Sequence, residues 1–568
     1  MKVSVIVNQK NSIFDTEKSI LQNINEMGID IPTLCYHEDI STSGVCKVCS
    51  VEIVGRGLVT SCDNYPEDKM ELFTHSNKVE EFRKDRIKDI LKDHSNDCLT
   101  CEKAMGDCEL QNISYEYGVE NRGDGTREKK AIDNSSFAFV RDMNKCIGCQ
   151  KCVKVCEEIQ GIGVYCVKED GTIGMTHETL AETNCIACGQ CVKICPVGAL
   201  HEKIDLKGLN YDLKNPEKHI IVQMAPAVKN TLGEEFGILP GTDVTKKMVA
   251  ALKELGFDKV FSTDFGADVT IMEEGTEFLD RFTNGGVLPM FTSCCPGWVN
   301  YAEINHPEFL DNLSSCKSPQ QIFGALSKSY YSKVSKVKPA DIFSVSIMPC
   351  TAKKTEIRRD MLTDDDGNKD VDLVITTREL AKLFKMNKIS LANYKKEEEF
   401  DKFLGEGTGA ARIFATTGGV MEAALRTVSD VLGETTHSLE YKEVRGFEGI
   451  REASLTIAGK EVNVAVINGI KGATPFLESI KRGERKVDFI EVMACVGGCL
   501  NGGGAPAPDN LRVVAQRRAG LYNSDETSPL RKSHENIEVK KLYEEFLGKP
   551  GGHKSHHLLH THYESRKK

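Results

Sequence analysis

The clustering of the 22 cysteines constrains this chain more than any other feature of its sequence. The cysteines fall into groups of differing spacing, which are Cys35, Cys46, Cys49 and Cys62; Cys98, Cys101 and Cys108; Cys146, Cys149, Cys152 and Cys156; Cys185, Cys188, Cys191 and Cys195; Cys294 and Cys295; and Cys350, Cys495 and Cys499. Repeated short spacings in a reduced protein are typical of metal ligands rather than disulfides. The sequence therefore predicts a protein organised around several metal centres.

The N-terminal stretch MKVSVIVNQK has no apolar run long enough for a secretory leader. No segment approaches the roughly 18 apolar residues of a membrane helix. We therefore expect a cytoplasmic protein without membrane association, in which thiols stay reduced. The net charge of −11 argues against general nucleic-acid binding, which needs a basic surface. A length of 568 residues predicts several domains.

Residues 1–78 combine a strand, a helix and a cysteine-bearing loop. Alternating valines predict a strand with one buried face, namely Val3, Val5 and Val7. A helix is expected near 19–27, and 51–62 is interpreted as a strand ending at a cysteine. Three loop thiols and a later one suit a [2Fe–2S] cluster, although the first gap of ten residues differs from the plant-type spacing. The predicted ligands are Cys35, Cys46, Cys49 and Cys62.

Residues 79–125 carry one histidine and three cysteines in close succession. Three thiolates and one imidazole suit a [4Fe–4S] cluster, and the neutral imidazole changes the charge of the cluster and so its potential. The predicted ligands are His94, Cys98, Cys101 and Cys108.

Residues 126–209 contain the run C-x2-C-x2-C-x3-C twice. In bacterial two-cluster ferredoxins the fourth cysteine of each run binds the cluster of the other run. The two predicted [4Fe–4S] ligand sets are Cys146, Cys149, Cys152 and Cys195, and Cys185, Cys188, Cys191 and Cys156. Zinc is the alternative for a C-x2-C pair, and the doubled four-cysteine run disfavours it.

Residues 210–568 form a large region of mixed α/β character. Apolar runs predict buried strands at 219–226, 341–350, 372–377, 462–469 and 487–495. Three of these runs end in a candidate site residue, namely Pro226, Cys350 and Cys495. Ligand sites lie beyond the carboxyl ends of strands in open α/β sheets. We therefore expect a site where these strands end.

Three separated motifs in this region supply thiolates for one more cluster. They are TSCCPGW (292–298), MPCTAKK (348–354) and EVMACVGGCLNGGG (491–504). Cys350, Cys495 and Cys499, with one of the 294/295 pair, make four ligands for a [4Fe–4S] cubane. The glycines of the third motif are expected to let the backbone approach a bulky inorganic group.

These motifs resemble the three signatures of the [FeFe] (iron-only) hydrogenases, and the resemblance runs over essentially the whole chain. It implies a monomeric clostridial-type enzyme that forms H2 reversibly from protons and the electrons of reduced ferredoxin. The implied fold is multidomain α+β and α/β. It has a β-grasp [2Fe–2S] ferredoxin domain over 1–78, a small [4Fe–4S] domain with one histidine and three cysteine ligands over 79–125, a two-cluster ferredoxin domain over 126–209, and a catalytic domain with a small-subunit-like extension over 210–568. The first two also resemble the large iron–sulfur subunit of respiratory complex I.

The resemblance also implies the catalytic cofactor, the H-cluster, which is a [4Fe–4S] cubane joined to a two-iron unit with CO, CN and azadithiolate ligands. The implied cubane ligands are Cys295, Cys350, Cys495 and Cys499, and Cys499 would also hold the two-iron unit. Cys294 would be the proton donor and acceptor. Lys353 would hydrogen-bond a cyanide. The other pocket residues would be Pro226, Ala227, Gln320, Met348 and Met493.

A charged stripe is predicted on a helix at 271–282, where Glu274, Glu277 and Arg281 share one face. Taken alone, such a stripe is typical of a solvated surface. With Ser314, however, it matches the family's proton relay leading to the Cys294 position.

Three alternative functions remain open at this point. Hydrogenase-like iron–sulfur assembly proteins generally lack the thiol of Cys294 and the two-iron site residues, and sensory hydrogenases usually alter the Cys294 position. An electron-conducting subunit would explain residues 1–209 alone. For the hydrogenase, the resemblance implies ferredoxin or a similar one-electron carrier and dedicated maturation proteins as partners.

Some residues have no assigned role. Cys166 and Cys316 are expected to be buried small apolar side chains. The five histidines of 548–568 are expected to lie in a solvated tail rather than at a metal site. Three positions depart from what relatives more often carry, namely Ala227, Val496 and Ala505.

Overall fold

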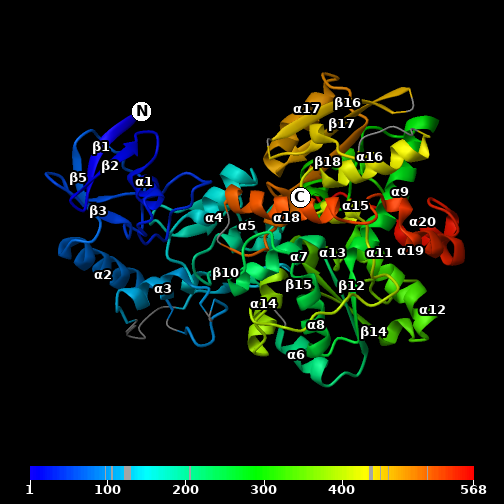
Figure 1. The fold of residues 1–568 in the computed structure, drawn as a ribbon, viewed down its shortest axis with the longest axis horizontal. Coiled ribbons are helices and arrows are strands. Elements are labelled where there is room, and N and C mark those ends of the chain that lie inside the picture. Colours follow the sequence, from blue (N-terminus) through cyan, green and yellow to red (C-terminus); the bar gives the residue numbers. More distant parts are fainter. Residues whose placement is uncertain are drawn as a thin grey trace. The chain divides into compact units, whose positions relative to one another are not determined.

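The computed structural model describes residues 1–95, 97–103, 106–120, 129–203, 206–433, 439–447, 449–457, 459–507 and 510–567. The chain folds into two compact units, whose elements are labelled in Figure 1. The N-terminal unit comprises Met1–Glu158, Ile162–Thr183 and Ile194–His201, and the C-terminal unit comprises Ile159–Gly161, Asn184–Lys193 and Glu202–Lys568. The expected boundary at 125/126 lies outside the described residues. No described helix is both long and apolar enough to cross a membrane.

A five-stranded sheet of order β2-β1-β5-β3-β4 begins the N-terminal unit. Its strands are β1 (Lys2–Val7), β2 (Lys10–Asp15), β3 (Ser50–Ile53), β4 (Gly57–Thr60) and β5 (Met70–Phe73). The predicted alternation is confirmed, because all three valines of β1 are buried. Helix α1 (Ile20–Glu26) lies within its predicted range. The interpretation of 51–62 as one strand is wrong, because Gly55 and Gly57, both at φ +82°, turn it into the antiparallel hairpin β3–β4.

The rest of the N-terminal unit is made of short elements around the cysteine loops. Its helices are α2 (Asn77–Lys92), α3 (Glu109–Glu116) and α4 (Lys151–Lys154). Two small sheets, of order β10-β7-β6 and β8-β9, contain β6 (Ile132–Asp133), β7 (Phe139–Asp142), β8 (Tyr165–Val167), β9 (Ile173–Met175) and β10 (Leu200–Glu202). The Ser76 side chain caps α2 by accepting from the backbone N–H of Val79.

The helices of the C-terminal unit frame two separate sheets. They are α5 (Gln190–Lys193), α6 (Leu206–Lys214), α7 (Pro226–Thr231), α8 (Thr245–Leu255), α9 (Thr263–Asn284), α10 (Pro296–Asn305), α11 (Pro319–Leu326), α12 (Ser332–Ser335), α13 (Ala352–Glu356), α14 (Thr377–Met386), α15 (Gly409–Ile413), α16 (Gly419–Val431), α17 (Ala473–Lys481), α18 (Leu511–Glu526), α19 (Ile537–Leu542) and α20 (His553–Leu559). Helix α9 contains the predicted 271–282 helix and extends beyond both of its ends.

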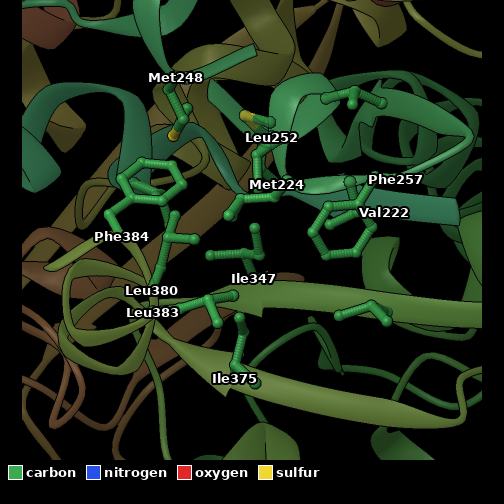
Figure 2. Close-up of a cluster of buried hydrophobic side chains, with 14 of the residues drawn as sticks. Val222, Met224, Met248, Leu252, Phe257, Ile347, Ile375, Leu380, Leu383 and Phe384 are labelled. Atoms are coloured by element: carbon green, nitrogen blue, oxygen red, sulfur yellow. The ribbon is translucent and has the colours of Figure 1, made fainter. Parts of the chain in front are cut away.

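The first sheet is fully parallel, with the order β12-β11-β14-β15. Its strands are β11 (His219–Met224), β12 (Lys259–Ser262), β14 (Ile342–Met348) and β15 (Leu373–Thr376). Nearly continuous apolar strands are typical of parallel sheets that are covered on both faces. Figure 2 shows one covered face, where Met224 and Ile347 of the sheet meet Leu252 of α8 and Phe384 of α14.

The second sheet is mixed, with the order β13-β18-β17-β16. Its strands are β13 (Met290–Phe291), β16 (Ile450–Ile457), β17 (Lys460–Asn468) and β18 (Phe489–Met493). Strands β13, β17 and β18 run parallel, and β16 closes the edge as an antiparallel hairpin with β17. The five strands predicted for this region are confirmed as β11, β14, β15, β17 and β18, and they are divided between the two sheets (Figure 1).

The C-terminal segment packs on the unit through both backbone and side chains. Leu559 is buried, the backbone N–H of Lys317 donates to its carbonyl at 2.8 Å, and His560 pairs with Cys316 in an isolated β-bridge. The prediction of a solvated tail agrees with the exposure of the other four histidines and is wrong for His560, which is buried. This histidine is held at 9% exposure because α20 returns the chain to the segment before α11.

Candidate active site

A cavity of about 80 Å³ in the C-terminal unit is lined by every cysteine of the three motifs. These residues are Cys294, Cys295, Cys350, Cys495 and Cys499. Strand β13 leads into the first pair, β14 into Cys350 and β18 into Cys495, so the carboxyl ends of strands from both sheets converge there. The cysteines expected beyond the strand ends do meet in one cavity, and that cavity draws on two sheets rather than one.

The remaining predicted pocket residues line the same cavity. They are Pro226, Ala227, Gln320, Met348, Lys353 and Met493. Proline occupies the first turn of α7, α10 and α11, where its missing N–H has no helical partner in any case. These sharp helix starts bring Pro226, Pro296 and Pro319 to the cavity wall. The lining is therefore largely apolar, apart from the thiols, Lys353 and a few polar atoms.

The thiols of the cavity are suited to an iron–sulfur group. None of the 22 cysteines, all of which lie within the described ranges, forms a disulfide. Burial and neighbouring thiols raise the pKa of Cys350 to about 12, and burial with the nearby Cys295 raises that of Cys495 to about 11. Without a metal, these thiols therefore stay protonated and neutral near pH 7. A bound metal would displace their protons and use the thiolates as ligands. Four such thiols around one space match the donor set of a [4Fe–4S] cubane.

The glycine-rich third motif meets protein backbone as well as the cavity. Gly498 and Gly502 line the cavity. A Cβ at Gly502 would lie 2.1 Å from the Pro349 carbonyl oxygen, and one at Gly503 would lie 2.1 Å from that of Cys188. The expected reason for these glycines is therefore incomplete, because at least two of them are required by close backbone packing.

The second ferredoxin-like cysteine loop, residues 184–193 of the C-terminal unit, touches the cavity loops. Gln190 donates from Nε2 to the Cys495 sulfur at 3.2 Å and to the Asn501 carbonyl oxygen at 2.7 Å. Thr351, the neighbour of Cys350, donates from its hydroxyl to the Ala187 carbonyl oxygen at 2.7 Å. Two predicted cysteine sites are thus joined by direct hydrogen bonds that no spacing pattern indicated.

Lys353 is buried at the cavity wall and is paired with a carboxylate that the sequence analysis missed. Its Nζ lies 3.0 and 3.1 Å from the two oxygens of Glu356, 2.8 Å from Ser318 Oγ and 3.2 Å from the Cys294 carbonyl oxygen. Gln320 also donates to Glu356, at 2.9 Å. Because Glu356 follows Lys353 by one helical turn in α13, the i,i+3 spacing was the available signal.

The predicted relay residues lie together between α9 and the segment that follows α10. Arg281 donates to Glu277 Oε1 at 2.6 Å, and the Ser314 hydroxyl donates to Glu277 Oε2 at 2.8 Å. Glu274, one turn earlier in α9, is fully buried, with Ser314 and the Ser293 backbone near its carboxyl group. Burial, followed by the charge of Glu277, raises the pKa of Glu274 to about 8.

Cys294 stands at the inner end of these groups. Burial, reinforced by the nearby Glu274 carboxyl, raises the pKa of its thiol well above the ordinary value. A protonated carboxyl and a protonated thiol can therefore both exist near neutral pH at neighbouring positions. The arrangement can hold and pass a proton between α9 and the cavity.

The first cysteine group of the N-terminal unit is preassembled as two pairs. Cys35 and Cys46 have their sulfur atoms 3.2 Å apart, and a thiol hydrogen bond joins Cys49 to Cys62. All four side chains are buried. Two thiol pairs suit a binuclear cluster, in which each iron takes two protein ligands.

The other cysteine groups are brought together to different extents. One small cavity of the N-terminal unit is lined by the whole first ferredoxin-like set, Cys146, Cys149, Cys152 and Cys195. In the second set, burial and then the charges of Cys495, Cys191 and Cys185 raise the pKa of Cys188, so Cys191 and Cys185 lie near it, whereas Cys156 belongs to the N-terminal unit. In the histidine-containing set, Cys98 and Cys101 lie near Cys108, and His94 is buried. The last two ligand sets stay predictions.

Two of the unassigned residues can now be placed. Cys316 is buried, as expected, but the expectation for Cys166 is wrong, because this residue lies exposed on the short strand β8.

Comparisons with known proteins agree with this geometry. The family described as iron only hydrogenase large subunit, C-terminal domain, matches residues 218–503, and iron hydrogenase small subunit matches 511–566. Upstream, a 2Fe-2S iron-sulfur cluster binding domain matches 1–77 and a 4Fe-4S dicluster domain matches 145–199. The NADH-ubiquinone oxidoreductase-G iron-sulfur binding region matches 83–122.

Individual relatives match along nearly the full length. Iron hydrogenase 1 of Clostridium pasteurianum is 44% identical, over 99% of this chain and 99% of its own length. The NADP-reducing hydrogenase subunit HndD of Solidesulfovibrio fructosivorans is 43% identical, over 100% and 99%. A solved structure of an apo [FeFe]-hydrogenase HydA1 variant from Chlamydomonas reinhardtii, 41% identical, superposes with a TM-score of 0.58 over 64% of this chain and 100% of that one. The chain therefore belongs to the [FeFe] (iron-only) hydrogenases, a family of iron–sulfur oxidoreductases.

Proposed function

We propose that the chain catalyses H2 + 2 oxidized ferredoxin = 2 reduced ferredoxin + 2 H+ in both directions, with ferredoxin or a similar one-electron carrier as its partner. The observation that carries this proposal is the single cavity where five thiols from three distant motifs meet beside the buried Glu274. Such a cavity combines a metal donor set with a route for protons.

In this proposal, Cys295, Cys350, Cys495 and Cys499 would hold the cubane of the H-cluster, and Cys499 would also hold the two-iron unit. When bound, the H-cluster supplies the two-electron chemistry that interconverts protons and H2. The ammonium of Lys353 attracts an anionic ligand of this group, because a buried cation interacts strongly with an anion where water is scarce. Glu356 holds that ammonium in place.

Protons move along the chain's own side chains. The Glu274 carboxyl, kept protonated by burial up to about pH 8, gives its proton toward the Cys294 sulfur as the Cys294 thiol proton leaves into the cavity. Glu277, hydrogen-bonded to Ser314 and Arg281, then returns a proton to Glu274. Each step moves one proton and no electron, and H2 oxidation reverses every step.

The upstream cysteine groups complete the proposal. A β-grasp domain at 1–78 would hold one [2Fe–2S] cluster, and the domains at 79–125 and 126–209 would hold three accessory [4Fe–4S] clusters, groups that supply one-electron transfer. We further propose a cytoplasmic monomer that depends on maturation proteins for the two-iron unit.

An iron–sulfur assembly protein or a sensor is the second candidate. Cys294, Lys353 and Cys499 line one cavity in this chain, so the thiol and cation needed for turnover are all present at one place. This observation favours catalysis over both alternatives.

The decisive experiment is an H2-evolution assay with reduced methyl viologen on protein matured with its two-iron unit. We expect H2 from the matured protein, infrared bands of bound CO and CN, and no H2 from the same protein without maturation. Matured protein that shows the CO and CN bands but produces no H2 would contradict the proposal.

A further inference from the structure

The outer end of the relay holds a group that is poorly suited to passing protons. Arg281 donates to Glu277 at 2.6 Å and also to the carbonyl oxygens of Asp311 at 3.1 Å and Leu313 at 3.0 Å. A guanidinium has no acceptor and does not lose a proton in proteins. Arg281 therefore anchors Glu277, and a group that titrates near neutral pH is needed to load it.

A second hydrogen-bonded branch reaches Glu277 from the C-terminal segment. The backbone N–H of Ser315 lies 3.1 and 3.2 Å from the two Glu277 oxygens, and its hydroxyl donates to Oε1 at 3.2 Å. The same hydroxyl lies 2.8 Å from Nδ1 of His560. One serine thus connects the relay carboxylate to a buried imidazole.

The far side of His560 is stabilised by a buried carboxylate. Its Nε2 lies 3.1 Å from Glu273 Oε2, and Glu273 also accepts from Tyr543 Oη at 2.5 Å and from the Gly551 backbone N–H at 2.8 Å. Glu273 is fully buried, so the imidazole is held between a buried carboxylate on one side and the Ser315 hydroxyl on the other.

The route from His560 toward solvent passes a second histidine. His556 is exposed, and its ring stacks on that of His560 with centroids 4.4 Å apart and an interplanar angle of 12°. Burial and the charge of His560 lower the pKa of His556. The titratable groups around His560 are thus Glu273, Glu277, Tyr543, His556 and Cys316, its partner in the β-bridge.

We propose that His560 is a positioning residue of the relay, through which protons enter and leave Glu277 by way of Ser315; this inference rests on the proposed function. The imidazolium gives its Nδ1 proton to Ser315 Oγ while the serine hydroxyl proton moves to Glu277. The neutral ring keeps its Nε2 proton, turns to expose Nδ1 on the solvent side where His556 lies, takes the next proton at Nδ1 and turns back to Ser315. One proton enters for each proton passed on, no electron moves, and H2 oxidation runs the sequence backwards. Histidine suits this role because its charge changes near neutral pH.

The test compares matured His560→Gln, His560→Ala and Ser315→Ala proteins with wild type and with His562→Gln. His562 is the matched control, because it lies two residues away with a side chain that is 67% exposed. We expect His560→Gln and Ser315→Ala to lower kcat for H2 evolution about tenfold, less than the roughly 10²–10⁴-fold of a group that acts directly on the reacting atoms, because both residues act through Glu277. The KM for methyl viologen and the CO and CN infrared bands should stay unchanged.

Two further readouts separate proton transfer from a structural role. Added imidazole should restore part of the kcat of His560→Ala and should not affect Ser315→Ala. The solvent deuterium isotope effect should rise in His560→Gln and stay at the wild-type value in His562→Gln.

The proposal is overturned if His560→Gln keeps the wild-type kcat, or if imidazole leaves His560→Ala unchanged while the infrared bands are intact. Loss of those bands in both His560→Gln and Ser315→Ala would also overturn it, since both substitutions would then act on assembly of the site. Matured wild type without H2 production contradicts the proposed function itself. An active wild type with unaffected variants contradicts this inference alone.

Discussion

The cysteines of the N-terminal unit and those of the cavity are assembled at different ranges along the chain. In the first group, Cys35 meets Cys46 at 3.2 Å across eleven positions of sequence. In the cavity, the Cys295 sulfur accepts from the Ala494 backbone N–H at 3.5 Å across 199 positions. The first arrangement needs one loop and the β3–β4 hairpin that follows it, and the second needs two complete sheets.

This difference shows which part of the molecule each substitution should affect. The first cysteine group can form wherever its loop and the adjoining hairpin are intact, because short stretches of chain bring its thiols together. The cavity forms only when β11, β13, β14 and β18 end at one place, so its geometry depends on the packing of the whole unit. Substitutions in the two regions should therefore have separable effects on iron content and on turnover.

The largest effect is expected from Cys294→Ser, which would show that the cavity does more than bind metal. H2 evolution should fall by about 10²–10⁴-fold, the range contributed by general acid–base groups, because a hydroxyl is a far weaker acid than the thiol. Iron content and infrared bands should match wild type. Cys316→Ala is the control, because that thiol is buried outside the cavity lining. Wild-type turnover in Cys294→Ser would remove Cys294 from the mechanism.

A smaller effect is expected from Glu274→Gln, which tests the acidic group behind the cavity. The pKa of Glu274 is raised to about 8, so the carboxyl holds a proton below that pH and loses it above. Wild-type H2 evolution should therefore decline as the pH rises through about 8. The glutamine variant should be slower by about tenfold or more and should lack this decline.

The matched control for Glu274→Gln is Asp280→Asn, an exposed acid on the same helix α9. It should keep both the rate and the pH profile of wild type. A Glu274→Gln protein with the wild-type decline near pH 8 would assign that decline to another group.

Cys49→Ser tests the first cysteine group of the N-terminal unit and should leave the cavity intact. Removing one thiol of the pair Cys49–Cys62 should cost the protein its [2Fe–2S] signal in electron paramagnetic resonance. The rate with ferredoxin should fall several-fold, while the rate with methyl viologen should change little. Cys166→Ser is the control, because this thiol is exposed and outside every predicted ligand set. An equal loss of rate with ferredoxin and with methyl viologen would show that the first cysteine group and the cavity cannot be perturbed separately.

The smallest effect is expected from Gln190→Leu, at the contact between a local cysteine loop and the cavity. It removes the donor to Cys495, a hydrogen bond worth about 1 kcal/mol. Hydrogen bonds to cluster sulfur raise the reduction potential, and this energy corresponds to about 40 mV for one electron. We expect a downward shift of that order in a redox titration, with H2 evolution changed by less than about fivefold. An unchanged potential would show that this contact is only structural.

Several features of the fold and site could be predicted from the sequence. The apolar runs of 342–348 and 489–493 became buried strands because continuous apolar character at strand length has few other stable placements. The stripe of Glu274, Glu277 and Arg281 was readable because helical periodicity alone puts them on one side of α9. By contrast, 51–62 was misread because two glycines with φ +82° broke a continuous β-like composition.

By itself, the sequence determined which thiols have metal-binding spacing, which segments form strands, and which residues share a helix face, since each depends on neighbours within a few turns of chain. Only the tertiary structure decided that Gln190 donates to Cys495, that Glu356 holds Lys353 beside the Cys294 carbonyl, and that His560 reaches the relay through Ser315. The physical reason is that contacts between residues far apart in the chain arise from packing of whole elements. No local periodicity records which elements will meet.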